Sequence, residues 1–264
     1  MKKIAILLLA ILIFSCSDDD EKGTVENKGQ LAMIFNESVK NDSNPVDKTE
    51  KFMFDGERLI QHIIKQRYFE EEISNEVNLS YSDNQVTVTT DYLTLVYTLN
   101  SEGYASQCVY SLSSQNRIYQ FSYSAEGYLT GIVENIDNTE YSSTSLTYEN
   151  GDITSISSKM NGLENKFIYE PGEESSTYHL PCLGLLEIHP LTFHIEALYA
   201  GLLGKDPRHF TIRSCPAGSN DEKTIYSYEF DKKGNPSRMI CQTTYAGGQA
   251  SYYPYTRNIS VSFE

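Results

Sequence analysis

The sequence predicts a mainly β protein, an antiparallel meander of repeated hairpins that curls into an open or barrel-like sheet. The clearest hairpin spans residues 118–132, where aromatic side chains alternate at Tyr119, Phe121 and Tyr123 and a polar tip follows with Gly127. Alternation with a period of two puts the three rings on one face of a strand, and glycine supplies the positive φ of a tight turn. This segment is therefore predicted as a strand, a turn and a returning strand.

The hairpin pattern recurs through most of the chain. Further turns are predicted after short aromatic or aliphatic alternations at residues 55–56, 82–84, 101–103, 150–151, 170–172 and 231–234. The dipeptide Asn150-Gly151 is the strongest of these turn signals. The spacing between the copies is irregular, whereas a solenoid keeps a stricter period, so the repeats predict a meander.

The two faces of the predicted sheet differ in polarity. Between residues 85 and 99, one face carries aliphatic and aromatic side chains, and the other carries mainly threonines. A hydroxyl-rich face is typical of contact with water. A barrel embedded in a membrane needs an apolar outer band on every strand, and these strands do not provide one. We therefore expect the sheet to face water on its outer side.

One segment departs from the strand pattern. Residues 180–210 are predicted as a helical insert with an amphipathic helix at 190–203, because four aliphatic residues recur at helical spacing: Leu191, Ile195, Leu198 and Leu202. A lone amphipathic helix must bury its apolar stripe on the sheet, or inside the sheet if it curls.

The N-terminal residues predict export and lipidation. Residues 1–15 combine Lys2 and Lys3 with a short apolar run, which is typical of a secretory signal. The following Cys16 completes a sequence that resembles a bacterial lipobox, so we expect Cys16 to be lipidated; an ordinary signal peptide with an incidental cysteine is the alternative. An acidic run then resembles a surface-export tag, although such a run can also be a solvated tether: Ser17, Asp18, Asp19, Asp20 and Glu21.

These signals divide the chain and place it in the cell. We predict a signal peptide at 1–15, a lipidated flexible tether at 16–30, and a single β-rich domain at 31–264 with a helical insert at about 180–210. The predicted location is the outer membrane, reached through the lipid anchor, with the domain exposed at the cell surface.

The charge of the chain excludes one class of partner. Without residues 1–15, the remaining 19 basic residues oppose 36 acidic residues and give a net charge of −17. A surface of this sign repels the phosphate backbone, so no nucleic acid is expected as a partner.

Cysteines and histidines give no strong signal of a metal or redox site. The cysteines of the domain, Cys108, Cys182, Cys215 and Cys241, are widely separated; we expect buried thiols, or a Cys182–Cys215 bridge if one forms. His189 and His194 are five residues apart with a proline between them, and Glu187 and Glu196 lie nearby. That spacing does not fit a pair of ligands on one helix face, so no metal and no cofactor are predicted.

A tyrosine cluster near the C-terminus is the candidate ligand contact. Tyr252, Tyr253 and Tyr255 surround Pro254, and three rings around a proline cannot all face one side of a regular strand. Exposed clustered aromatic side chains tend to be contact sites. A terminal strand that packs on the sheet edge is the alternative.

Together, several of these features resemble a known family. The lipobox with its acidic run, the repeated hairpins and the stretch at 198–205, LYAGLLGK, resemble lipoproteins of a domain-of-unknown-function family described as having a porin-like fold. The hairpins are similar to the tyrosine–aspartate repeats of Rhs-type shell proteins. The resemblance covers about residues 50 to 264 and implies a curled antiparallel sheet or barrel-like body. It carries no catalytic residues.

The predicted function is a surface-tethered, non-enzymatic binding or adaptor module for an unknown glycan or protein ligand. No nucleophile elbow, phosphate loop or dinucleotide fingerprint occurs in the sequence. An envelope structural component that binds a membrane partner protein is the alternative, and a hydrolase with an unrecognised carboxylate pair is a third reading.

Overall fold

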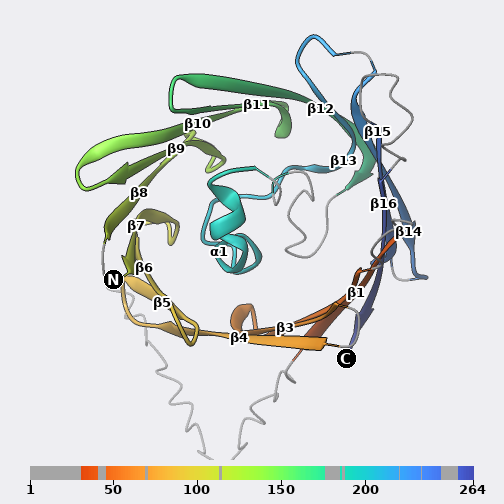
Figure 1. Cartoon of the computed structure of the whole chain (residues 1–264), viewed down its shortest axis with the longest axis horizontal. Coiled ribbons are helices and arrows are strands. Elements are labelled where there is room, and N and C mark those ends of the chain that lie inside the picture. The colour runs from red at the N-terminus through yellow and green to blue at the C-terminus, as the bar shows by residue number, and fades with distance from the viewer. Residues whose placement is uncertain are drawn as a thin grey trace, which may run out of the picture.

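Sixteen antiparallel strands close into a barrel around a short helical segment (Figure 1). The computed structural model describes residues 31–40, 46–68, 71–112, 115–175, 185, 188–219, 221–232, 234–244 and 255–264. Each strand pairs with the next along the chain, and β1 pairs with β16 to complete the ring. The prediction of a mainly β meander that curls into a barrel-like sheet is confirmed.

The elements are β1 (Leu31–Lys40), β2 (Val46–Asp55), β3 (Arg58–Tyr68), β4 (Glu71–Tyr81), β5 (Gln85–Thr89), β6 (Thr94–Leu99), β7 (Ala105–Leu112), β8 (Gln115–Tyr123), β9 (Leu129–Ile136), β10 (Thr139–Glu149), β11 (Asp152–Met160), β12 (Leu163–Ser175), a 3₁₀ turn (Leu191–Phe193), α1 (Ile195–Tyr199), β13 (His209–Pro216), β14 (Lys223–Phe230), β15 (Pro236–Thr244) and β16 (Tyr255–Phe263). Within the described ranges, neither helical element has the length and apolarity that crossing a bilayer requires.

The apolar face of each strand lines the lumen, and the polar face lies outside. On β5 and β6, Val86 pairs with Tyr97 and Val88 with Leu95, and all four side chains are buried. The residues between them, such as Thr87, remain partly exposed on the outer wall. On β8, Tyr119, Phe121 and Tyr123 point into the lumen as the alternation predicted.

The hairpin prediction was wrong at residues 170–172. Strand β12 continues through this segment to Ser175, and its register against β13 shifts at Glu170 and Pro171. A proline has no N–H for the ladder, and the register shift lets the strand accommodate it without reversing. The turns that were not predicted include Asp137-Asn138 and Asn161-Gly162, where both residues of each pair have positive φ as a two-residue hairpin turn requires.

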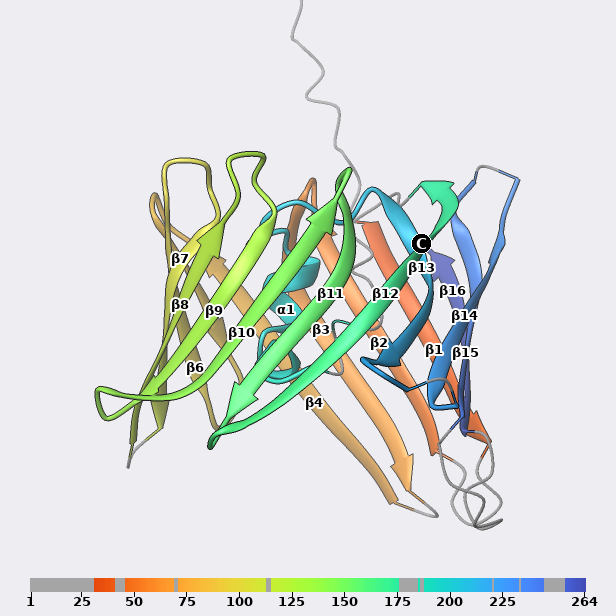
Figure 2. The same cartoon turned by 90° about the horizontal axis from the view of Figure 1, so that it is seen from above.

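The described residues between β12 and β13 include α1, which lies in the lumen (Figure 2). We call these described residues, 185 and 188–208, the plug. The predicted helix at 190–203 is much shorter than expected: a 3₁₀ turn and the five-residue α1 are separated by His194, whose φ of −124° is not helical. A continuous helix presents one apolar stripe, whereas the curved wall surrounds the plug. The broken path lets buried side chains meet the wall in several directions.

The apolar residues predicted for the helix stripe mostly form the core of the plug. Leu191, Leu198 and Leu202 are buried, and Ile195 is half-buried. Tyr199 packs on the wall at Phe52, with ring centroids 4.0 Å apart. These contacts place the hydrophobic core between the plug and the inner face of the barrel.

The cysteines of the barrel behave as thiols. Cys108 is a buried free thiol, and burial raises its pKa to about 12. Cys215 on β13 is also free, so the Cys182–Cys215 bridge is not formed; Cys182 itself lies outside the described residues.

Replacing Leu198 with aspartate tests the packing of the plug. An unpaired carboxylate would be buried at a side chain that is now 7% exposed, which costs several kcal/mol of a total stability of about 5–15 kcal/mol. We expect a large drop in melting temperature by calorimetry. Leu163→Asp is the matched control, because Leu163 is 74% exposed and the same change there should leave the melting temperature nearly unchanged. Equal effects of the two changes would contradict a packed plug.

Candidate functional site

The order of the strands places one set of hairpin tips around the plug. In an antiparallel meander, alternate connections lie at the same end of the barrel. The connections at 55–58, 99–105, 123–129 and 149–152 therefore share one end with the link between β12 and β13. We call this the plug end.

Three backbone hydrogen bonds attach the plug to the tips and to the adjoining strand. The Ala105 N–H donates to the Leu202 carbonyl at 2.7 Å, the Lys205 N–H to Gly127 at 2.9 Å, and the Arg208 N–H to Gly151 at 3.0 Å. The stretch that suggested a family in the sequence is thus the part of the plug that docks on consecutive hairpins.

This docking requires a glycine at position 204. Gly204 has φ +89°, and a Cβ there would lie 2.6 Å from the Gly127 carbonyl oxygen and 3.0 Å from the Tyr123 ring. The Tyr123 hydroxyl in turn donates to the Ala105 carbonyl at 2.6 Å. The plug and the β8–β9 tip therefore approach each other too closely for any other residue at this position.

A buried histidine between two carboxylates connects α1 to the wall. His62 on β3 is fully buried, with Nδ1 2.8 Å from Glu196 on α1 and Nε2 3.4 Å from Glu50 on β2. Burial lowers the pKa of His62, but the carboxylates of Glu196 and Glu50 outweigh burial and raise it above its usual value. Burial likewise raises the pKa of Glu50, and His62 and Lys48 bring it below normal. The arrangement therefore favours a charged imidazolium in the barrel interior.

A second buried carboxylate holds the start of the plug. Glu134 on β9 accepts from His189 Nε2 at 2.6 Å and from the Ser142 hydroxyl at 2.7 Å, and Arg117 lies 3.3 Å away. The hydroxyls of Thr144 and Ser158 both donate to the His189 carbonyl at 3.2 Å. His189 is thus fixed by its side chain and its backbone.

A third histidine is held neutral. His194 is fully buried, its Nδ1 lies 2.8 Å from the Tyr97 hydroxyl, and its ring packs edge-on against Tyr119 at 4.4 Å. Burial lowers its pKa to about 3. Protonating this ring would place an unpaired charge in the aromatic core.

The histidines near position 190 therefore serve packing and do not converge on a metal. His189 pairs with Glu134, His194 with Tyr97, and Glu196 with His62, while Glu187 lies outside the described residues. In the described part of the chain, no group of three or more His, Cys, Asp or Glu residues is placed to hold a metal ion.

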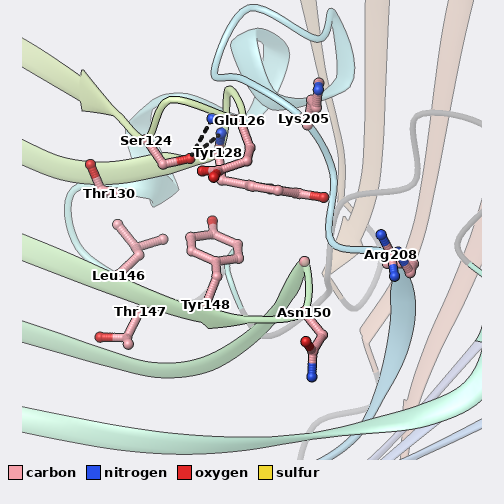
Figure 3. Close-up of a pocket in the computed structure, with 11 residues that line it drawn as sticks. Ser124, Glu126, Tyr128, Thr130, Leu146, Thr147, Tyr148, Asn150, Lys205 and Arg208 are labelled. Carbon is pink, nitrogen blue, oxygen red and sulfur yellow. Dashed lines mark hydrogen bonds between the residues drawn. The ribbon is translucent and has the colours of Figure 1, made fainter.

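A polar pocket of about 700 Å³ lies at the plug end (Figure 3). Its lining comes from the β8–β9 and β10–β11 hairpins and the last plug residues, and we call it the mouth pocket: Ser124, Glu126, Tyr128, Thr130, Leu146, Thr147, Tyr148, Asn150, Gly151, Lys205 and Arg208. This volume lies in the range of small-ligand sites.

Two stacked tyrosines and two exposed cations define the chemistry of the mouth pocket. The rings of Tyr128 and Tyr148, from neighbouring hairpins, stack with centroids 5.0 Å apart. Lys205 and Arg208 are exposed on the plug side. The carboxyl of Glu126 has a lowered pKa, mainly through Ser124 and more weakly through Lys205, so it is ionised at neutral pH. The pocket can offer aromatic faces, hydroxyl and amide groups, and positive charge.

The lining of the mouth pocket includes none of the site residues predicted from the sequence. Cys16, the acidic run 17–21, Tyr252 and Tyr253 are outside the described residues; β16 begins at Tyr255, whose side chain is also outside them, at the end of the barrel opposite the plug end. The mouth pocket was not predicted. Its one sequence signal is the position of the two tyrosines near tip glycines: Tyr128 directly follows Gly127, and Tyr148 lies three residues before Gly151.

The buried histidines should make stability depend on pH. The raised pKa of His62 means that its stabilisation is complete below about pH 6.5 and is lost as pH rises through its pKa in the folded protein. Because the pKa of His194 is lowered, the contribution of this residue to the free energy of unfolding is fully present above about pH 6.5 and is lost as the pH falls toward 3. We expect the free energy of unfolding, measured with urea between pH 6 and 9, to fall on the alkaline side by up to about 1.4 kcal/mol per pH unit. In His62→Gln this alkaline decline should flatten; identical slopes in both proteins would contradict the assignment.

Solved structures share this barrel. A crystal structure of a porin-like protein from Bacteroides uniformis has a TM-score of 0.80 and 26% identity, covering 88% of this chain and 96% of that one. A porin-like protein from Bacteroides vulgatus has a TM-score of 0.54 at 12% identity, covering 86% and 96%, and supports the fold alone. No curated protein matches the chain. The predicted resemblance to a domain-of-unknown-function family with a porin-like fold is confirmed. Because residues 38–238 match its model, the chain belongs to the family described as a domain of unknown function (DUF4595) with porin-like fold.

Proposed function

We propose that the chain is a lipid-anchored outer-membrane lipoprotein, exposed at the cell surface, that acts as a non-enzymatic binding or adaptor module. The observation that carries this proposal is the filled lumen. The barrel core is a contact between wall and plug, and the mouth pocket at the plug end presents the polar and aromatic groups that a ligand can reach.

The filled lumen argues against a role as a pore. Tyr97 and Phe52 of the wall are fully buried, and the plug side chains Leu191 and Tyr199 are buried with them. Polar contacts between plug and wall, such as that of His62 with Glu196, would have to break before the plug could leave the lumen. The fold is described as porin-like, while the described plug packs against the inner face of the wall.

The polarity of the wall supports a barrel that stands in water. The outer face carries partly exposed Thr87, Thr89, Ser143 and Ser145, and the aromatic residues of the hairpins point inward. A barrel in a bilayer has the opposite arrangement, with an apolar outer band flanked by aromatic girdles. The proposed attachment is therefore the lipid on Cys16, and residues 16–30 provide the tether.

The positions of the titratable groups support binding over catalysis. His62 and His194 are fully buried and occupied by wall–plug contacts, where a substrate cannot reach them. Among the lining residues of the mouth pocket, Glu126 is the single carboxylate. A glycoside hydrolase of the usual kind requires two carboxylates on opposite sides of the scissile bond.

Attachment and exposure can be tested on intact cells. Protease added to the outside should remove the protein, because the proposal places residues 31–264 beyond the outer membrane. Cys16→Ala should release the protein from membranes or stall its processing, which membrane fractionation detects. Full protection from protease with retained anchoring would contradict surface exposure.

A glycan array with the mature protein and its variants should show which tyrosines contact a glycan. We expect Tyr128→Leu, which removes one ring of the stacked pair, to abolish the wild-type signal. Tyr253→Ala tests the cluster predicted from the sequence. Loss of the signal only in Tyr253→Ala would assign the contact to Tyr252, Tyr253 and Tyr255 instead. As a stability reference, Tyr123→Ala should lower the free energy of unfolding by about 3–5 kcal/mol, because this ring packs against the core.

A further inference from the structure

The mouth pocket is positively charged in a strongly acidic protein. Its charged lining residues are Lys205, Arg208 and Glu126, which sum to a charge of +1, whereas the chain as a whole carries −15. Within the described residues, neither Lys205 nor Arg208 forms an ion pair. Because Glu126 can offset only one of the two positive charges, the excess charge beside two aromatic rings indicates an anionic group on the ligand.

Backbone hydrogen bonds hold Lys205 and Arg208 beside the hairpins that carry the two rings. The backbone of Lys205 is hydrogen-bonded to the tip before Tyr128, and that of Arg208 to the tip after Tyr148. A Cβ on Gly151 would lie 2.7 Å from the Tyr128 hydroxyl and 3.6 Å from Arg208 Nε. The phenol and the guanidinium therefore converge over the same tip glycine, which has φ +89° and no side chain to separate them.

The surroundings limit how much negative charge the ligand can carry. Exposed carboxylates occupy the hairpin tips at the plug end, at Glu102, Glu126 and Glu149. A phosphate or a polyanion would be repelled by these groups. A single carboxylate, by contrast, needs one cationic partner, and a guanidinium can bind it with two parallel hydrogen bonds.

The remaining lining suits the neutral part of a sugar. Tyrosine rings offer flat apolar faces, and the hydroxyl groups of Ser124, Thr130 and Thr147 with the Asn150 amide offer hydrogen-bond donors and acceptors. We propose that the mouth pocket binds an oligosaccharide that carries one carboxylate, with Arg208 and Lys205 contacting the carboxylate and Tyr128 and Tyr148 contacting a sugar ring. This inference rests on the proposed binding function and names its ligand class.

The test compares matched acidic and neutral sugars on the full mature protein. Calorimetry would use sialyllactose with lactose, and glucuronosyl-xylotriose with xylotriose. We expect at least one acidic sugar to bind about tenfold or more tightly than its neutral counterpart, because a charge-assisted contact is present only in the acidic sugar. Methyl esterification of the carboxylate should remove the difference, and so should Arg208→Gln.

Matched variants separate a charge effect from a folding effect. Arg208→Lys keeps the positive charge but loses the two parallel hydrogen bonds that a guanidinium can donate. This variant should retain part of the preference for acidic over neutral sugars. Lys65→Gln, an exposed lysine on β3 far from the mouth pocket, should change nothing. An unchanged melting temperature would show that Arg208→Gln acts on binding, and an altered preference in Lys65→Gln would contradict a local contact.

The remaining outcomes distinguish the inference from the proposed function. Equal binding of acidic and neutral sugars that is lost in Tyr128→Leu would overturn the carboxylate assignment and leave a binding pocket. Binding of none of these sugars, together with capture of a protein that depends on Tyr128, would overturn the saccharide class and retain the binding module. No ligand of either kind that depends on Tyr128, Tyr148 or Arg208 would overturn the inference and the role of the mouth pocket in the proposed function.

Discussion

The width of a closed sixteen-stranded ring is the constraint on which the rest of this structure depends. An eight-stranded barrel can be filled by the side chains of its own wall, whereas sixteen strands enclose a lumen that wall side chains cannot span. An apolar inner face around such a lumen would be unstable in water. The plug, which lies between β12 and β13 in the sequence, packs against this apolar inner face. Closure of the wall and folding of the plug therefore depend on each other.

The polar contacts of the lumen follow from the same constraint. Burying Glu50, His62 and Glu196 costs desolvation energy, and each charge is compensated by an opposite charge at the wall–plug boundary. The pairs join α1 to β2 and β3 at defined positions. They fix where the plug sits, and thereby fix Lys205 and Arg208 against the tips that form the mouth pocket.

Local sequence patterns predicted the wall well and the plug poorly. Alternation over residues 85–99 identified the buried face correctly because a strand side chain has only two directions to choose from. The aliphatic spacing around Leu198 indicated a long helix, but α1 ends after five residues, where Ala200 caps it and Gly201 has φ +68°. The strand through Pro171 and the turn at Asp137-Asn138 also depended on pairing partners that local patterns do not contain.

The mouth pocket could not be predicted for a related reason. Its residues come from two hairpins and a segment more than fifty positions further along the chain, and no motif links them. Tyr128 and Tyr148 look like other hairpin tyrosines, and only the pairing of consecutive hairpins brings their rings together. The tyrosine cluster around Pro254 was predicted as a contact because its residues are adjacent in sequence, whereas convergence in space leaves no such local pattern.

The pairing of β1 with both β2 and β16 has a mechanical consequence. The backbones of Ala32 and Glu264 exchange two hydrogen bonds at the plug end, and register continues from Met33 to Lys40 on the β16 side and from Leu31 to Val39 on the β2 side. A load applied to the chain ahead of Leu31 and directed along β1 is therefore carried in shear by two ladders at once. Peeling, which breaks hydrogen bonds one at a time, would require a free edge, and the closed ring has none.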